Sequence, residues 1–375
     1  MIEKMLARQA RTATVIAGWV LGLSLGLSGQ TVETIATGLD NPRGLAFGPE
    51  GALYVVEAGR GGPGPCTAGP EGTVCYGPTG AVTRIDLRRN VRERVATGLP
   101  SLAGASGIRA NGPHDIAFLG RGNAAVVIGF VGDPRARADL GAAGSNFGQL
   151  ASLTASGNWR LTTDLGLFES AANPNGDEID SNPYAVLALP DKHIVVDAGS
   201  NDLLEVGANG RVAALATFTD RLVPAPPFLG LPPGAQVPMD AVPTSVALGR
   251  DGYFYVGQLT GFPFPVGGAN VFRVPASGGV PEVFASGFTA IIDLAWGPDG
   301  SLYVLEIAKN GLLVGFGSED WAGALIRVAP NGSRTEIAPG QLTAPGGVAV
   351  GPDGALYITN QGIYSGAGTV LRIRP

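Results

Sequence analysis

Five carboxylate or amide side chains stand at matching places in a repeated sequence pattern, each at the end of a short apolar run. They are Glu57, Asp197, Gln258, Glu306 and Asn360, and the sixth matching position holds Ile128. Carboxylate and amide oxygens are the ligands that Ca²⁺ prefers in proteins. If the runs end around one opening, the sequence predicts a bound Ca²⁺ ion. The predicted metal ligands are Glu57, Asp197, Asn201, Glu306 and Asn360.

The same opening is predicted to carry reacting groups. His114 is one of only two histidines, and an imidazole of ordinary pKa is a candidate general base near neutral pH. A cation beside it would polarise a carbonyl group or activate a bound water. The catalytic candidates are therefore His114, Glu57 and Glu306. The residues predicted to bind a small-molecule ligand are Arg43, Asp115, Tyr184, Gln258, Asp293 and Asn360.

The elements that must position these residues are repeats. The stretch "LAFGPEGALYVVEAG" at 45–59 returns as "LAWGPDGSLYVLEIA" at 294–308 and as "VAVGPDGALYITNQG" at 348–362. Six copies align on the Gly-Pro-acid-Gly turn, one of them degenerate, at 119–123. Each copy alternates apolar and small residues with period two and continues into two more strand-like runs. Four antiparallel strands per copy form one blade, so we predict an all-β, six-bladed β-propeller domain over residues 30–375.

The last copy is one strand short, because it ends with "GTVLRIRP" at 368–375. A spare strand-like run, "TVETIATGL" at 31–39, precedes the first copy. The sequence therefore predicts that residues 31–37 supply the outer strand of the last blade and close the ring. Closure of this kind would cover a sheet edge that otherwise invites aggregation.

The polar residues have structural alternatives that the sequence leaves open. A polar side chain where a strand leaves a sheet can hydrogen-bond the adjoining turn or solvate the rim of the channel. His114 can fill the channel and bond a neighbouring blade. Three insertions, at 165–184, 220–243 and 258–269, are predicted to rise over the opening as a cup with one acidic and one apolar wall. Such a cup suits an uncharged or cationic, partly aromatic small molecule.

Composition excludes several classes of function. The net charge of the 375 residues is −6, and no basic cluster extends beyond Arg88 and Arg89, which excludes nucleic acid as a partner. Only one of the two histidines is expected at the opening, which excludes a zinc site built on several imidazoles. The chain has no Gly-x-Ser-x-Gly nucleophile elbow.

The N-terminus indicates export. Lys4, Arg8 and Arg11 precede an apolar stretch at 13–29, the pattern of a secretory signal peptide over residues 1–29. The alternative is that this segment stays uncleaved as a membrane anchor, and we expect no other contact with a membrane. The only cysteines, Cys66 and Cys75, are predicted to form a disulfide in the oxidising environment outside the cytoplasm. We expect a periplasmic or extracellular bacterial protein that acts as a monomer.

The stretches "GLDNPRGLAFGPEGALYVVEAGRGG", "GPHDIAF" and "GGVAVGPDGALYITNQG" resemble the ScyD/ScyE family of exported bacterial propellers. More widely, the chain is similar to six-bladed NHL and gluconolactonase-like propellers. The resemblance implies an exported six-bladed propeller and names no reaction, so whether the chain is an enzyme stays open. Two hypotheses follow: a propeller that binds a small molecule or acts as a scaffold at an acidic channel mouth, or a metal-assisted, lactonase-like hydrolase or isomerase of a small carbonyl compound.

Overall fold

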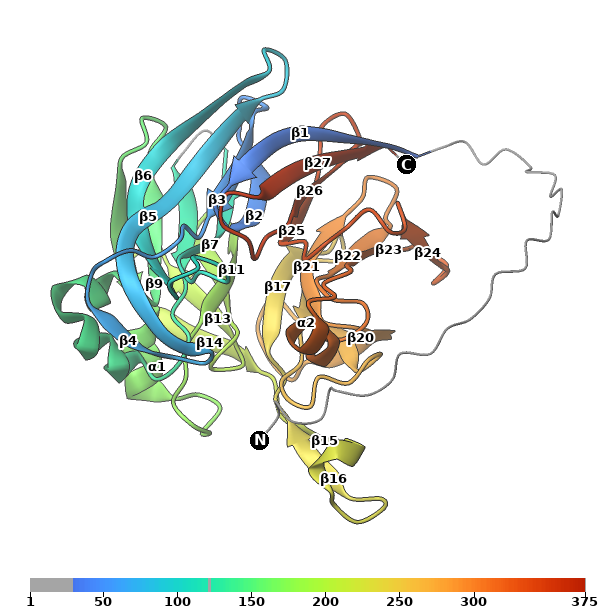
Figure 1. Ribbon diagram of the computed structural model, residues 1–375. Helices are drawn as coiled ribbons and strands as arrows, with labels where there is room; N and C mark the ends of the chain where they lie inside the picture. The colour runs from blue at the N-terminus through green and yellow to red at the C-terminus, as the bar shows by residue number, and fades with distance from the viewer. Residues whose placement is uncertain (1–29, 121–122, 375) are drawn as a thin grey trace, which may run out of the picture.

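The computed structural model describes residues 30–120 and 123–374, so the predicted signal peptide at 1–29 lies outside the described residues. Strands dominate, and six antiparallel sheets follow one another around a ring (Figure 1). The predicted fold class, an all-β six-bladed propeller, is confirmed. Across the described ranges, no helix has the length and apolar character needed to cross a membrane.

Each blade consists of four antiparallel strands, ordered from the centre of the ring outward. Blade 1 contains β2 (Pro42–Phe47), β3 (Leu53–Glu57), β5 (Gly72–Asp86) and β6 (Val91–Ala103), and blade 2 contains β7 (Pro113–Phe118), β8 (Ala124–Ile128), β9 (Gln149–Leu153) and β10 (Trp159–Asp164). Blade 3 contains β11 (Pro183–Ala188), β12 (Lys192–Asp197), β13 (Asp202–Gly207) and β14 (Val212–Thr217), and blade 4 contains β17 (Pro243–Leu248), β18 (Phe254–Gln258), β19 (Ala269–Val274) and β20 (Glu282–Phe288). Blade 5 contains β21 (Ile291–Trp296), β22 (Leu302–Glu306), β23 (Ala324–Val328) and β24 (Arg334–Ile337), and blade 6 contains β25 (Gly347–Val350), β26 (Leu356–Asn360), β27 (Gly368–Arg374) and β1 (Thr31–Leu39).

The core lies between the blades. The inner strand of each blade packs on the inner strand of the next, and β25 packs on β2, so the contacts run around the whole ring. The second strand of a blade has neighbours on both faces, and Leu53, Val55 and Val56 of β3 are all fully buried. A lone sheet would leave one of these faces in water, so the blades stabilise one another by burying apolar area.

Strand β1 occupies the place predicted for residues 31–37. It pairs antiparallel with β27 from Thr31 opposite Arg374 to Leu39 opposite Gly368 (Figure 1). Ala36 and Leu39 of this strand are buried at the boundary with blade 1. The outer strand of the last sheet therefore comes from the other end of the described chain.

The repeated Gly-Pro-acid-Gly turn joins the first two strands of a blade at the end opposite the strand starts. The last glycine of the turn is left-handed, with φ of 80° at Gly51, a conformation that favours glycine. The acid holds two strands: Glu50 accepts a 2.5 Å hydrogen bond from the Tyr54 hydroxyl and lies 3.1 Å from Arg84. Both pairings recur at Asp251 and Asp353, and Asp299 keeps the pairing with an arginine. The repeated acids therefore have a structural role, because they connect the turn to the neighbouring strands of the blade.

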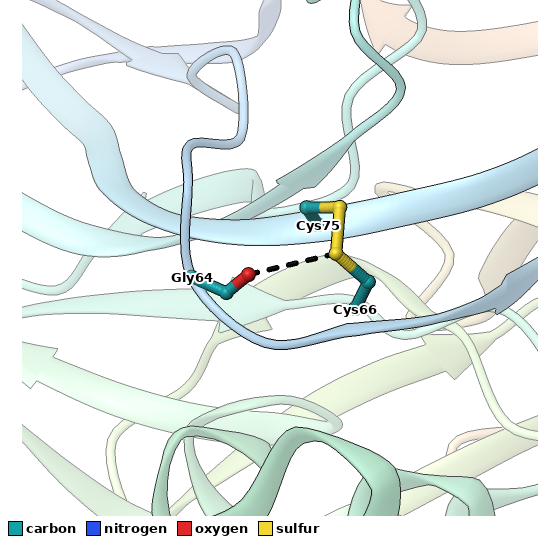
Figure 2. Close-up of a disulfide and its surroundings, with 3 residues drawn as sticks. All are labelled: Gly64, Cys66 and Cys75. Atoms are coloured by element: carbon teal, nitrogen blue, oxygen red, sulfur yellow. Dashed lines mark hydrogen bonds between the residues drawn. A yellow bond between two sulfur atoms is a disulfide. The ribbon is translucent and has the colours of Figure 1, made fainter.

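Five insertions with secondary structure of their own leave the blades. Strand β4 (Cys66–Gly69) pairs with the first part of β5, and the predicted disulfide between Cys66 and Cys75 joins these two strands (Figure 2). Blade 2 carries η1 (Pro134–Asn146), and α1 (Leu165–Ala172) follows it. The hairpin of β15 (Arg221–Pro224) and β16 (Gln236–Met239), with η2 (Pro227–Leu229) near its tip, projects from the ring (Figure 1). Helix α2 (Leu312–Ser318) interrupts blade 5, where we predicted no insertion.

Candidate functional site

A cavity of about 570 Å³ lies over the end of the ring where the inner strands start. Three residues predicted for this opening, Arg43, His114 and Tyr184, line it. Further parts of the wall come from the tip of the β4–β5 hairpin, from residues 102–111, from α2 and the segment that follows it, and from single residues of other blades. Most of these side chains are apolar, among them Ile108, Phe264, Ile292, Leu312, Phe316 and Trp321.

Arg43 places a buried positive charge in this cavity. Its side chain is 8% exposed, and Nη2 donates a 2.9 Å hydrogen bond to the carbonyl oxygen of Ala110. Its Nε is buried without a hydrogen-bond partner. Within residues 30–120 and 123–374, no carboxylate oxygen lies within 4.0 Å of its guanidinium group. A buried guanidinium is costly unless an acceptor pairs with it, so the cavity is suited to a ligand oxygen, best an anionic one.

His114 and Tyr184 stand beside Arg43. Their rings lie 4.7 Å apart, and Nδ1 of His114 is 3.2 Å from the carbonyl oxygen of Pro183 in the next blade. Burial, with the positive charge of Arg43, lowers the pKa of His114 to about 3. An imidazole with such a pKa is neutral but a weak base at pH 7. His114 thus lines the cavity. It also contacts the neighbouring blade, which was the structural role predicted as an alternative to catalysis.

Asp115 and Asp293 occupy equivalent places in blades 2 and 5. Asp115 accepts hydrogen bonds from the amides of Ile116 (2.8 Å) and of Val186 in the next blade (2.9 Å). Asp293 accepts them from Leu294 (2.8 Å) and from Val348 in the next blade (2.7 Å). Burial raises the pKa of Asp293 to about 7, and burial together with the charge of Asp293 raises the pKa of Asp115 well above its usual value. The two carboxyl groups therefore tie blades together at the cost of a buried charge.

The raised pKa values predict how stability changes with pH. Between pH 4 and pH 7 the native protein holds a proton on Asp293 that the unfolded chain has lost, so native stability falls as the pH rises. We expect Asp293→Asn to gain stability relative to the unaltered protein across this window, by at most about 1.4 kcal/mol per pH unit. Urea unfolding at each pH measures the difference. Asp115, Tyr184 and Arg43 face the same region, and the variant also removes the part of the raised pKa of Asp115 that the charge of Asp293 causes.

Asp299→Asn is the matched control for that series. Hydrogen bonding to Arg327 at an exposed turn lowers the pKa of Asp299 to about 2, so this group is ionised in both states from pH 5 upward. Its variant should differ from the unaltered protein by a constant amount between pH 5 and pH 7. Equal behaviour of the Asp293 and Asp299 variants would contradict the assignment of a raised pKa to Asp293.

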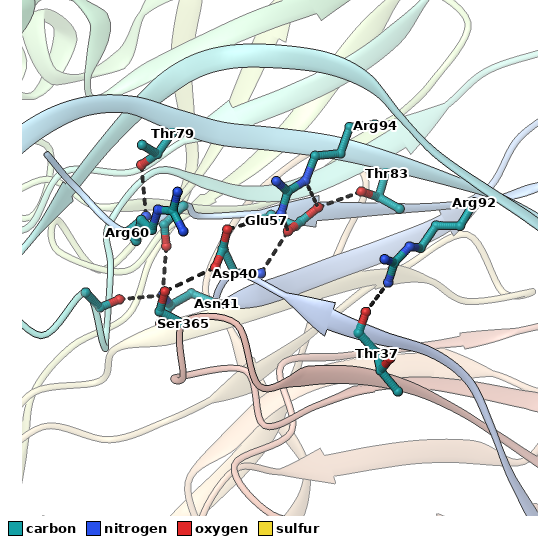
Figure 3. A network of polar contacts seen from close by, with 12 residues as sticks. Thr37, Asp40, Asn41, Glu57, Arg60, Thr79, Thr83, Arg92, Arg94 and Ser365 are labelled. Atoms are coloured by element: carbon teal, nitrogen blue, oxygen red, sulfur yellow. Dashed lines mark hydrogen bonds and ion pairs between the residues drawn. The ribbon is translucent and has the colours of Figure 1, made fainter.

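Glu57, predicted as a metal ligand and catalytic residue, is fully buried among donors of its own chain (Figure 3). Oε2 accepts the amide N–H of Asp40 at 2.8 Å and lies 2.6 Å from Nη2 of Arg94. Oε1 accepts the hydroxyl of Thr83 at 2.5 Å and Nε of Arg94 at 3.1 Å. Four donors already use both oxygens, and none of them comes from the cavity.

The other predicted metal ligands accept backbone amides in the same way. Each accepts a backbone amide of a segment that enters a blade: Asp197 from Asn182 (2.6 Å), Asn201 from Val242 (2.7 Å), Glu306 from Thr289 (2.8 Å) and Asn360 from Thr343 (2.8 Å). Gln258, predicted to bind ligand, accepts the amide of Asn270. These side chains, with Glu57, are absent from the cavity wall, and the described part of the chain has no group of three or more His, Cys, Asp or Glu residues placed to hold a metal. The structure thus does not bring the predicted ring of oxygens to one point.

These contacts have a local physical reason. The amides of Asp40, Thr289 and Thr343 precede residues with positive φ, namely Asn41 (49°), Ala290 (48°) and Ala344 (41°). This backbone conformation is unfavourable and turns the preceding amide inward. A side-chain oxygen on the neighbouring strand accepts the hydrogen bond of that amide and so compensates for the cost. The structural alternative for the strand-end residues, hydrogen bonding to an adjoining turn, is the arrangement observed.

The prediction of an acidic opening also differs from the cavity observed. The charged residues in the wall are Arg43, Arg109 and Glu71, and the last two form an ion pair of 2.7 Å. Arg109 also lies 5.7 Å and 5.9 Å from the ring centres of Phe316 and Trp321, within the range of cation–π contacts. Sequence reasoning missed this wall, although Leu312 and Phe316, four residues apart, were a helical signal.

The comparisons with known proteins support the fold. Neither a family model nor a curated protein matches the chain. A solved Bacteroides thetaiotaomicron protein of unknown function is similar over 92% of this chain and 76% of its own, with 11% identity and a TM-score of 0.56. A gluconolactonase from Xanthomonas campestris is similar over 93% and 91%, with 10% identity and a TM-score of 0.53. A glucose dehydrogenase is similar over 92% and 99%, with 14% identity and a TM-score of 0.53.

At these identities the comparisons show a shared propeller fold, as expected for a gluconolactonase-like propeller, and no shared activity. They do not include the ScyD/ScyE family, so that resemblance stays a proposal. The chain is a six-bladed β-propeller whose cavity is lined by a buried arginine, Arg43, with an Nε that has no hydrogen-bond partner.

Proposed function

We propose that this protein binds a small molecule with an aromatic or otherwise apolar body and one carboxylate, phenolate or carbonyl oxygen. The observation that carries the proposal is the Nε of Arg43, buried and without a hydrogen-bond partner in a cavity of about 570 Å³. A ligand oxygen at Arg43 would pair this charge, while the apolar wall would take the rest of the molecule. The expected ligand therefore carries an anionic or neutral oxygen, whereas the loop sequences predicted an uncharged or cationic ligand.

The aromatic side chains at the rim support an apolar ligand. Phe264 in the cavity wall lies 6.1 Å from Phe262, measured between ring centres, and Phe262 lies 6.3 Å from Phe228 in the β15–β16 hairpin. Phe228 is 64% exposed, and Phe262 is 41% exposed. Exposed apolar side chains that continue into a pocket mark a binding surface better than scattered ones do.

The alternative, a metal-assisted, lactonase-like hydrolysis or isomerisation at this cavity, has less support. Arg43 and the hydroxyl of Tyr184 would suit a developing negative charge on a carbonyl oxygen. The reaction would also need a base, and the lowered pKa of His114 makes its imidazole a weak one. We therefore propose ligand binding as the function in preference to catalysis.

We further propose that the protein works outside the cytoplasm, as a propeller of the ScyD/ScyE type. The Cys66–Cys75 disulfide supports this location, because structural disulfides persist in oxidising compartments. Its position supports a role at the cavity, since it joins the two strands whose tip, residues 70–74, forms part of the cavity wall.

The test is Arg43→Met with 8-anilinonaphthalene-1-sulfonate, an aromatic anion whose fluorescence rises in apolar sites. We expect the native protein to bind it and the variant to bind it 10- to 100-fold more weakly, since a hydrogen bond to a charged group contributes about 1.5–3 kcal/mol. Arg84→Met, which removes the same charge from a part of strand β5 that does not line the cavity, is the control. Equal affinity in both variants would refute the proposal. Lactone turnover that Arg43→Met abolishes would favour the alternative.

A further inference from the structure

A second polar site lies where α1 meets the turn between β12 and β13. Both carboxylate oxygens of Glu169, both carboxylate oxygens of Asp202 and the hydroxyl of Ser200 are buried without a hydrogen-bond partner. Glu169 is 2% exposed, and Asp202 and Ser200 are fully buried. Five unpaired buried oxygens are unusual, because buried polar groups are nearly always hydrogen-bonded.

The chain brings these side chains to one place from three elements. Glu169 lies on α1, and the segment after α1 reaches the turn through Asn175, whose Nδ2 donates a 2.8 Å hydrogen bond to the carbonyl oxygen of Ser200. Asp202 begins β13 and stands opposite Asp197, the last residue of β12. One helical turn after Glu169, the side-chain oxygen of Asn173 is also without a partner.

None of the residues that the structure describes supplies a positive charge to this site. Across the described ranges, no Lys, Arg or His nitrogen lies within 4.0 Å of a carboxylate oxygen of Glu169 or Asp202. Asp197 adds negative charge, but its own oxygens accept four hydrogen bonds, from Ser181, Asn182, Gly199 and Ser200. Burial and the charge of Asp197 raise the pKa of Glu169 to about 7 and that of Asp202 to about 8. Buried acids without a partner are rarely retained, so an external cation is the missing component.

We propose that Glu169 and Asp202 bind one Ca²⁺ ion, with the hydroxyl of Ser200 as a further ligand. The unpartnered side-chain atoms of Glu169, Asp202 and Ser200 are all oxygens. Ca²⁺ accepts bidentate carboxylates and hydroxyl, carbonyl or water oxygens in flexible geometry. The pair of acids differs from the five residues predicted as metal ligands, whose oxygens already accept backbone amides. This proposal is independent of the cavity at Arg43.

The ion would also stabilise the part of the cavity wall that carries Asn182 and Tyr184. Asp197, next to the site, fixes Ser181 and Asn182, and these residues lead directly into Pro183 and Tyr184 of β11. Asn182 and Tyr184 line the cavity. A cation that holds α1 against the β12–β13 turn would therefore limit the movement of the strand that carries Tyr184.

The experiment compares chelator-treated protein with Ca²⁺ added back. We expect titration calorimetry to show one Ca²⁺ per chain, and the melting temperature to rise with Ca²⁺ concentration, because the ion binds the native state. Asp202→Asn and Glu169→Gln should each weaken binding at least tenfold. Asp177→Asn is the control, because it removes the same charge from an exposed residue of the segment that follows α1.

The outcomes are separable from a folding defect. Without Ca²⁺, Asp202→Asn should melt no lower than the native protein, since it removes a buried carboxylate that has no partner. A native protein whose melting temperature ignores Ca²⁺ and whose calorimetric titration is flat would overturn the proposal. Ca²⁺ affinity in Asp202→Asn and Glu169→Gln equal to that of Asp177→Asn would overturn it too, as would tighter binding of Mg²⁺ than of Ca²⁺.

Discussion

A chain that lacks residues 30–39 is expected to lose its cooperative fold. Strand β1 pairs along β27 and buries Ala36 and Leu39, so its removal exposes one whole edge of the sixth sheet. The loss of a strand and its packing exceeds what a marginally stable domain tolerates. Circular dichroism during heating should show no sharp transition, and size-exclusion chromatography should show aggregates formed through the open edge.

Two controls separate the role of β1 from the effect of a deletion as such. A peptide with the sequence of residues 30–39, added during refolding, should restore a cooperative transition by pairing with β27. Replacement of 225–235, the tip of the projecting β15–β16 hairpin, by Asn-Gly should change the melting temperature little. A truncated chain that melts as the full chain does would contradict the prediction, because it would show that the ring closes without β1.

The fold was predictable because the same sequence pattern recurs in six copies. Period-two patterns recur in each blade, and a turn with a left-handed glycine recurs in blades 1, 4, 5 and 6. Each copy supports the interpretation of the others. The place of β1 followed from counting, since the last copy had one strand too few. Cys66 and Cys75 were the only two cysteines, so their pairing allowed one solution.

The site was predicted only in part, because one residue type serves two purposes. A glutamate at the end of a strand can bind a metal or accept a backbone amide, and the sequence pattern is identical in both cases. Glu57 and Glu306 accept amides. The choice depends on where the preceding loop directs its N–H groups, which is set by backbone angles such as the φ of 48° at Ala290.

The cavity wall and the second acidic site were missed for a different reason. Helix α2 and residues 102–111 are insertions, so no other blade repeats them and their position over the ring could not be aligned. Glu169 and Asp202 are 33 residues apart in the sequence, from the difference of their numbers, and belong to different elements. Only the packing of α1 against the β12–β13 turn brings them together.

Glu57→Ala is expected to destabilise the protein by about 3 kcal/mol, because the buried hydroxyl of Thr83 and the amide of Asp40 each lose an acceptor. Arg94 adds less, since its side chain is 43% exposed and can turn toward water. Glu57→Gln keeps one acceptor oxygen and should lose less. Urea unfolding measures both, with Glu50→Ala, which breaks a surface ion pair, as a control expected below 1 kcal/mol.

Glu57 lies in a polar network that joins three elements where β1 leaves blade 6 and the chain enters blade 1 (Figure 3). Arg94 binds Glu57 and also lies 3.1 Å from Asp40, which in turn accepts the hydroxyl of Ser365 from the loop before β27. A double-mutant cycle of Glu57→Ala and Arg94→Ala should therefore show a coupling energy of about 1 kcal/mol. The destabilisation should be the same with Ca²⁺ and with a chelator. If Ca²⁺ enlarged it, Glu57 would act as a metal ligand and the structural account of this residue would be wrong.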